Sequence, residues 1–293
     1  MGTAFKWVQD REKLLLEKAR RMEYKEISRG DNLSIHFYFP KQFKSGPKRP
    51  LLLFFNDGGW DRGNVIQFAP QALYYVERGA VCGLVEYRNC SSHPESEPHD
   101  SLQDGFSAVQ FARNHTEDLH IDTEKIVMLG AGAGANIVAS AALQVSAPVE
   151  ESERESVGSL PNATVLISSI VEVVKGSYGY EQFRDPPDCK QADLIRFAKL
   201  CSAPMLILHG TADRISPFER VAEFAAAMKR KKADCEFVEF EGRDHSFFNL
   251  NVDPVSYEAS LTYIDGFFDR IGMLDKSNGG DGARIISRSE EDY

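Results

Sequence analysis

The sequence predicts an α/β domain built on a mostly parallel sheet of about eight strands, flanked by helices. Two observations carry this prediction: strand-length apolar runs alternate with helix-length segments from Leu51 onward, and an alternating hairpin precedes them. Runs that are apolar on both faces and alternate with helices are typical of a parallel sheet covered on both sides. The 293 residues, 42% of them hydrophobic, are enough for one such domain without a disulfide or metal.

The N-terminal elements come first. Residues 4–24 lack Gly and Pro and are rich in Leu, Glu, Lys and Arg, which predicts a helix packed outside the domain. The turn Gly30-Asp31-Asn32 is expected to join extended segments at 24–28 and 33–39 into a hairpin. We therefore divide the chain into three parts: an N-terminal helix at 1–23, an α/β domain at 24–272 and a polar tail at 273–293.

The elements after the hairpin follow in strict alternation. Strands are expected at 51–55, 80–85, 126–129, 163–168, 204–208 and 235–240. Helices are expected at 67–78, 101–115, 133–145, 191–200, 217–232 and 254–271.

Composition excludes several classes of function. The formal net charge is −10, and the longest basic run is the four residues Lys229 to Lys232, so no nucleic-acid partner is expected. The apolar runs are strand-sized and predict no membrane span. The N-terminus has no apolar leader region, and the five cysteines lack metal-ligand spacing and are interpreted as reduced thiols. We expect a cytoplasmic protein, or a secreted or periplasmic one if a leader has been removed, with no metal and no cofactor; the oligomeric state stays open.

Two glycine-rich segments follow strands where an open parallel sheet places its chemistry. Asn56-Asp57-Gly58-Gly59-Trp60 comes after the strand at 51–55, and its glycines can turn backbone N–H groups toward a ligand. Gly130-Ala131-Gly132-Ala133-Gly134 joins a strand to a helix. Its spacing does not fit a dinucleotide-binding loop. It does fit the G-x-S-x-G nucleophile elbow, except that Gly132 stands at the serine position.

An acid and a histidine complete the pattern. Asp213 follows the strand at 204–208, and His245 follows the next strand, 32 residues later along the chain. Nucleophile, acid and then histidine is the order of the hydrolases that use such an elbow. We therefore expect His245 and Asp213 to form a hydrogen-bonded dyad that faces the Gly132 turn.

These motifs together resemble the α/β-hydrolase superfamily, and within it the acetyl-esterase and feruloyl-esterase-like group related to hormone-sensitive lipase. The resemblance runs from about residue 24 to 272 and rests on five motifs: Phe54 to Trp60, Glu86-Tyr87-Arg88, Ile121 to Ile126, His209 to Asp213, and Asp244 to Phe248. It implies that His245 is the general base and that Asp213 orients it. It also implies an oxyanion hole formed by the N–H groups of three residues, Gly58, Gly59 and Ala133.

The chain departs from the family pattern at two places. Gly132 has no side chain to act as nucleophile, and Ser107, in Gly105-Phe106-Ser107-Ala108-Val109, lacks the second glycine and lies in a predicted helix. Asn56 and Asp57 stand where the family has His or Phe and then Gly. A carboxylate that pointed into the hole would oppose a developing oxyanion.

Three hypotheses follow for function. The first is a carboxylic-ester hydrolase fold that binds a small-molecule ester or carbohydrate ester but is catalytically impaired because position 132 is glycine. The second is an active carboxylesterase whose natural serine has been exchanged for glycine in this sequence. In the third, the His245–Asp213 dyad acts on water or on a substrate proton. The sequence leaves open whether Tyr178, Tyr180 and Phe183 line the ligand pocket.

Overall fold

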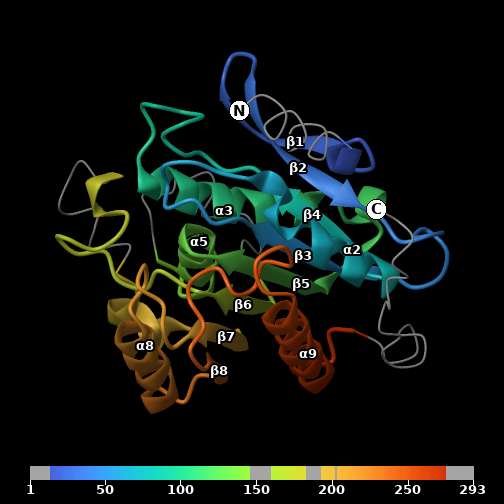
Figure 1. Cartoon of the computed structure of the whole chain (residues 1–293). Coiled ribbons are helices and arrows are strands. Elements are labelled where there is room, and N and C mark those ends of the chain that lie inside the picture. Colours follow the sequence, from blue (N-terminus) through green and yellow to red (C-terminus); the bar gives the residue numbers. More distant parts are fainter. Residues whose placement is uncertain (1–13, 146–159, 183–192, 202, 275–293) are drawn as a thin grey trace, which may run out of the picture.

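The computed structural model describes residues 14–145, 160–182, 193–201 and 203–274. It contains an eight-stranded sheet in the order β1-β2-β4-β3-β5-β6-β7-β8 (Figure 1). The strands are β1 (Arg20–Ser28), β2 (Asp31–Tyr38), β3 (Arg49–Phe55), β4 (Val81–Val85), β5 (Ile121–Ala131), β6 (Ala163–Ile167), β7 (Met205–Gly210) and β8 (Cys235–Phe240). Strand β2 pairs antiparallel with β1 and β4, and the pairs from β4 through β8 are parallel. The predicted fold class is confirmed.

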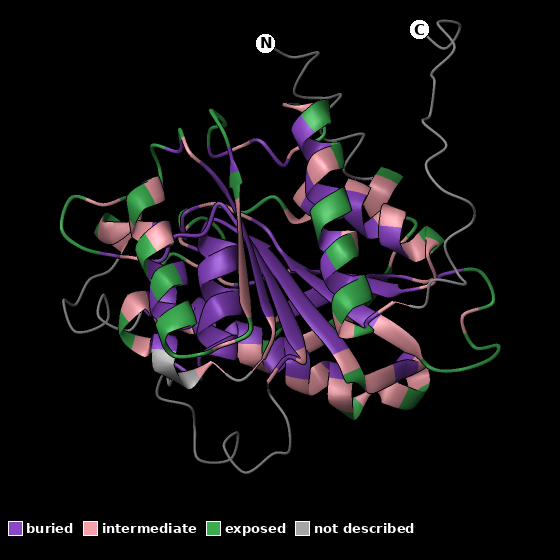
Figure 2. Cartoon of the chain, turned by 90° about the horizontal axis from the view of Figure 1, so that it is seen from below, coloured by how far each residue is buried: buried purple, intermediate pink, exposed green. Residues whose placement is uncertain are grey.

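Helices cover both faces of this sheet. They are α2 (Ala69–Glu77), α3 (Pro98–Asn114), α4 (Thr116–Leu119), α5 (Ala133–Ala142), α8 (Phe218–Arg230) and α9 (Pro254–Ile271). Alternate residues of β3 separate the two layers: Leu51 and Leu53 pack on the side of α3, α5 and α8, whereas Leu52 and Phe54 pack on the side of α2 and α9. The inner strands of the sheet are mostly buried, whereas the edge strands β1 and β8 are partly exposed and the helices expose their outer faces (Figure 2).

The N-terminal expectation is wrong in one respect. The helix predicted over 4–24 does not reach its end, because β1 begins at Arg20 and pairs with β2. Within the described residues its helical part is Leu14–Leu16, where the Leu15 carbonyl accepts a hydrogen bond of 2.9 Å from the Tyr38 hydroxyl. Residues 1–13, and the tail from residue 275, lie outside the described residues.

The other helices lie where they were expected, with one change of type. The segment predicted as a helix at 191–200 forms a 3₁₀ helix over Leu194–Leu200. Another 3₁₀ turn, Val65–Phe68, precedes α2. Of the part of the chain that the structure describes, no helix is both long enough and apolar enough to cross a bilayer.

Candidate active site

The turn between β5 and α5 has the backbone conformation of a nucleophile elbow. Gly132 has φ 53° and ψ −117°, and α5 begins at the next residue. Backbone crowds the flanking glycines: a Cβ on Gly134 would lie 2.5 Å from the Asn56 carbonyl oxygen, and one on Gly130 would overlap the Gly134 carbonyl. Glycine at position 130 therefore lets α5 turn back close to the end of β5, and glycine at position 134 lets α5 approach the end of β3.

The predicted dyad is present. His245 Nδ1 lies 2.8 Å from Asp213 Oδ2, and both side chains are buried. The other oxygen of Asp213 accepts hydrogen bonds from the backbone N–H groups of Ile215 (2.8 Å) and Ser216 (3.0 Å). These two hydrogen bonds position the Asp213 carboxylate, which in turn orients the His245 imidazole through its contact with Nδ1.

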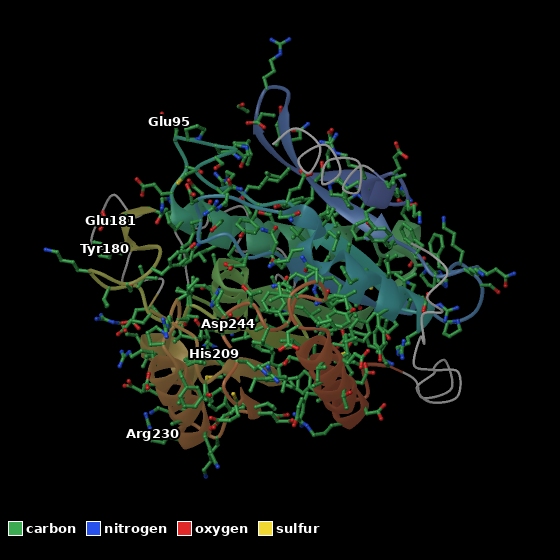
Figure 3. All side chains as sticks on the ribbon, in the orientation of Figure 1. Glu95, Tyr180, Glu181, His209, Arg230 and Asp244 are labelled. Carbon is green, nitrogen blue, oxygen red and sulfur yellow. The ribbon has the colours of Figure 1, made fainter. Side chains whose placement is uncertain are left out.

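Figure 3 labels His209, which lies in β7 just before the loop that carries Asp213, and Asp244, which precedes His245 in the loop after β8. His209 itself is buried, and its Nε2 lies 2.9 Å from the Ser216 carbonyl oxygen and 3.4 Å from Asp213 Oδ2. Burial lowers the pKa of His209, which agrees with a structural role as a neutral imidazole.

Asp57 occupies the space of the missing serine. A Cβ on Gly132 would overlap the carboxyl group of Asp57 and would lie 2.9 Å from its Oδ2. Oδ2 is 3.1 Å from His245 Nε2, the imidazole nitrogen that faces the elbow. Oδ1 accepts a hydrogen bond of 3.1 Å from the Ala133 N–H. The carboxylate therefore contacts both the histidine and a backbone donor expected of the oxyanion hole.

Polar contacts fix the backbone of Asp57. Its N–H donates to Gln67 Oε1 at 2.7 Å, and the Gln67 amide donates in turn to Asn249 Oδ1 at 3.3 Å. The Asn56 amide donates to the Asp57 carbonyl at 2.7 Å. The loop after β3 is thus tied to the 3₁₀ turn before α2 and to the segment after His245, and these ties point the carboxylate at Gly132.

The electrostatics of the site favour an ion pair. Burial lowers the pKa of His245, but the hydrogen bonds and charges of Asp213 and Asp57 outweigh it and raise the value to about 9. Burial raises the pKa of Asp57, yet its hydrogen bond with His245, the histidine charge and the amides of Ala133 and Gly58 lower it overall. At neutral pH His245 is therefore an imidazolium between two carboxylates.

The other two donors expected of the oxyanion hole, the N–H groups of Gly58 and Gly59, lie in the loop after β3 that also carries Asp57. The Gly58 carbonyl accepts hydrogen bonds from the N–H groups of Asp61 (3.1 Å) and Arg62 (3.2 Å), which form a turn. Gly59 has φ 59°, and the Tyr178 hydroxyl lies 2.6 Å from the place that a Cβ would take there. The sequence showed that Asp57 departs from the family pattern, but it did not predict that this side chain contacts His245 and Ala133. The one signal for these contacts in the sequence was that an unusual carboxylate at position 57 occurs together with a missing serine at position 132.

A cavity of about 210 Å³ lies beside the elbow. Ile170 lines it and donates its N–H to the Gly132 carbonyl at 3.3 Å, and Tyr178 lines it from the side of Gly59. Arg214 and Ile215 border it next to Asp213. Of the aromatic residues left open by the sequence, Tyr178 lines this cavity. Tyr180, labelled in Figure 3, packs against the cluster around Trp60, and Phe183 lies outside the described residues.

Comparison with known proteins agrees with this geometry. The alpha/beta hydrolase fold family matches residues 52–203, and the dienelactone hydrolase family matches residues 163–263. The chain belongs to the α/β-hydrolase fold family. A thermophilic esterase from the planctomycete Thermogutta terrifontis superimposes with a TM-score of 0.80 and 30% identity, over 90% of this chain and 96% of the other.

Curated relatives of this α/β-hydrolase are esterases. A probable isoprenylcysteine alpha-carbonyl methylesterase of Arabidopsis thaliana is 25% identical over 244 residues, or 75% of this chain and 50% of its own length. Esterase LipQ of Mycobacterium tuberculosis is 24% identical over 245 residues, or 78% and 56%. The chain spans about half the length of the curated relatives it matches. The family is therefore that of carboxylesterase-type α/β-hydrolases.

Proposed function

We propose that this protein is an esterase-fold member that binds a small ester, or a carbohydrate ester, without forming an acyl-enzyme at position 132. One observation carries the proposal: the carboxyl group of Asp57 occupies the volume in which the Cβ of a serine at position 132 would lie. An acyl-enzyme needs a hydroxyl or thiol next to an available base. Here the imidazole nitrogen that faces the elbow is 3.1 Å from a carboxylate instead.

The protonation of His245 supports the same conclusion. A general base must be unprotonated at working pH, and its pKa is best placed near that pH. The pKa of His245 is raised to about 9, so the imidazole already carries its second proton at neutral pH. This also argues against the hypothesis in which the His245–Asp213 dyad takes a proton from water. His245 Nε2, the nitrogen that would accept that proton, already lies 3.1 Å from Asp57 Oδ2.

The oxyanion hole is altered in the same direction. The Ala133 N–H donates to Asp57 Oδ1, so an ester carbonyl would have to displace a charged acceptor to reach it. The negative charge of Asp57 would oppose a tetrahedral oxyanion formed beside it. The nucleophile is absent because position 132 is glycine, and the Asp57 carboxylate alters both the base and the hole. Two changes that fit together favour an impaired natural site over a single exchange of serine for glycine.

Aryl acetate hydrolysis tests the proposal. We expect the protein to hydrolyse 4-nitrophenyl acetate no faster than its His245→Gln variant, and binding of a neutral short-chain ester, ethyl butyrate, to be measurable by calorimetry. The matched variant is Gly132→Ser with Asp57→Gly, which restores the hydroxyl and removes the carboxylate together. A burst of 4-nitrophenol from the unaltered protein, lost in His245→Gln, would contradict the proposal.

A further inference from the structure

The amino-terminal ends of β3, β4 and β5 lie together at one edge of the sheet, opposite the edge that carries the active site. Leu51 of β3 pairs with the first residue of β4 on one side and with a residue of β5 on the other. A basic residue stands within three positions before each of these paired residues: Arg49 on β3, Arg78 before β4 and Lys125 on β5. The register of three parallel strands therefore gathers cations from three separate segments at one place.

These side chains line a small pocket, which we call the basic pocket. Its volume is about 20 Å³, and Lys48 lines it together with Arg49, Arg78 and Lys125. No carboxylate is among the lining residues. Four cationic side chains thus surround one point in a chain whose formal net charge is −10. A pocket of this size admits one small group and excludes a larger organic ligand.

Most cations of the basic pocket lack an acidic partner. Lys48 is the exception, since its Nζ lies 2.5 Å from Oε1 of the exposed Glu117. The Lys125 ammonium has no hydrogen bond or ion pair among the described residues. Arg49 donates from Nη2 to the Ser45 carbonyl at 3.1 Å, but its Nε is buried and has no hydrogen-bond partner in the described part of the chain.

The contacts of Arg78 explain its position but not that of its neighbours. Its guanidinium lies 3.4 Å from the centroid of the Tyr74 ring, and Nη1 donates to the Tyr74 carbonyl at 3.3 Å, near the end of α2. These contacts give no reason for Arg49 and Lys125 to lie at the same pocket. Like charges repel, and a half-buried cation without a partner has lost part of its hydration. A bound anion would stabilise such an arrangement.

We propose that the basic pocket binds a phosphate group, either as inorganic phosphate or as the head of a phosphomonoester. A tetrahedral oxyanion presents several acceptor oxygens, and guanidinium groups bind phosphate through paired N–H donors. A phosphate group carries a charge of about −1.5 to −2 at pH 7, so it offsets more of the three unpaired cations than one carboxylate does. The organic part of a phosphomonoester would lie in solvent, because the pocket has room for the head alone.

Urea denaturation of the full chain tests the site, in phosphate and in chloride of the same ionic strength. Binding at one site should raise the ratio of folded to unfolded protein by the factor 1 + [phosphate]/Kd, about elevenfold at ten times Kd. Inorganic phosphate and phenyl phosphate form separate arms. Stabilisation by inorganic phosphate alone would identify the free ion as the ligand, whereas stabilisation by phenyl phosphate would identify a phosphomonoester. Stabilisation by neither, or an equal effect of chloride, would overturn the inference.

Lys125→Gln is the decisive variant, because loss of this ammonium leaves no described partner unpaired. Without phosphate and at low ionic strength, the variant should be at least as stable as the unaltered protein, since one of several repelling charges is gone. In phosphate the unaltered protein should be the more stable, and the Kd for phosphate should rise about tenfold in the variant. Arg49→Gln should raise this Kd in the same way. Lys231→Gln, in the basic run Lys229 to Lys232, is the matched control and should bind phosphate as the unaltered protein does.

The contrast between the two conditions separates binding from a structural role. If Lys125→Gln lost the same stability with and without phosphate, the lysine would be structural and the inference would be wrong. Equal phosphate affinity in Lys125→Gln and Lys231→Gln would place the ion elsewhere and would also overturn it. Should Arg49→Gln fail to fold, Lys125→Gln alone decides. The hydrolysis of aryl acetate depends on the opposite edge of the sheet, so the proposed function is tested separately.

Discussion

Asp57 and Gly132 are complementary: the carboxyl group of one fills the volume that a side chain on the other would take. The two residues lie at the ends of adjacent strands, because β3 and β5 pair in parallel with Phe55 opposite Gly130. A residue two positions beyond each of these therefore reaches the same point above the sheet edge. The absence of a side chain at position 132 and the presence of a carboxylate at position 57 are therefore structurally coupled, because the two cannot be changed independently without overlap.

Gly132→Ser should destabilise the protein and restore no ester hydrolysis. The serine would adopt φ 53° and its Cβ would overlap Asp57, so strain and overpacking together should cost about 2–4 kcal/mol of unfolding free energy. Adding Asp57→Gly removes the overlap and should recover about 1–3 kcal/mol of it. Chemical denaturation and an aryl acetate assay measure both effects.

The double variant should be the active one. It supplies the hydroxyl and leaves His245 with Asp213 alone, and loss of these triad parts in a serine hydrolase costs about 10⁶ in turnover. It also frees the Ala133 N–H. Gly132→Ser with Asp57→Asn is the control, because asparagine removes the charge but keeps the volume. If the asparagine form is as stable and as active as the glycine form, volume at position 57 is not what excludes a serine.

Gly134→Ala should destabilise the elbow independently of any catalytic role. The added Cβ would lie 2.5 Å from the Asn56 carbonyl oxygen and 2.7 Å from the Phe55 carbonyl carbon, and backbone atoms have little freedom to move. We expect a loss of about 2–4 kcal/mol of unfolding free energy. Gly266→Ala is the matched control: it lies inside α9 with nothing within 4 Å, and should stabilise the protein by roughly 0.5–1 kcal/mol. If thermal denaturation showed the same change in stability for Gly134→Ala and Gly266→Ala, crowding by the Phe55 and Asn56 backbone would not be what requires glycine at position 134.

The dyad was predictable because its position depends on strand order alone. Asp213 and His245 each follow a strand, and parallel neighbours such as β7 and β8 bring the residues after their carboxyl ends to one edge. The direction of the Asp57 side chain was not predictable in this way. It depends on the hydrogen bonds of Gln67, which joins Asp57 to Asn249, a residue 182 positions further along the chain.

The N-terminal helix ends earlier than predicted for a related reason. Helix-forming side chains dominate residues 4–24, but Met22 and Tyr24 pack against the apolar core from the edge of the sheet. The Tyr24 hydroxyl also donates to the Glu86 carbonyl at 2.7 Å. Pairing with β2 and these distant contacts outweigh a local preference worth tenths of a kcal/mol per residue, which is why Arg20 to Tyr24 are a strand.

Asp57→Asn should lower the pKa of His245. The Asp57 carboxylate contributes both a hydrogen bond and a charge to the value of about 9, and the asparagine amide carries no charge. Titration of the His245 ring by NMR should therefore give a pKa clearly below 9 in this variant. Asp61→Asn should leave the titration unchanged. An unaltered pKa in Asp57→Asn would mean that the imidazolium and this carboxylate are not paired in solution.

The same pairing makes stability depend on pH in the alkaline range. His245 has a pKa of about 9 in the folded protein and an ordinary value of 6.5, so the folded state holds the proton more tightly. Its contribution is complete below about pH 6.5 and is lost as the pH rises through about 9, and the difference corresponds to roughly 3 kcal/mol. Asp57 acts at the other end: its pKa is lowered, so its contribution is present above 3.8 and is lost as the pH falls through the folded value.

Between the two limits the ion pair is intact and its contribution to stability is greatest. Urea denaturation at about pH 6 and about pH 9 should show the unaltered protein losing more unfolding free energy than His245→Gln does, since only the former has this proton to release. The comparison between the two proteins cancels the groups they share, including the buried Cys82 thiol, whose pKa burial raises. Parallel pH profiles for the two proteins would show that His245 has the same proton affinity folded and unfolded, and the charge assignment of the site would then be wrong.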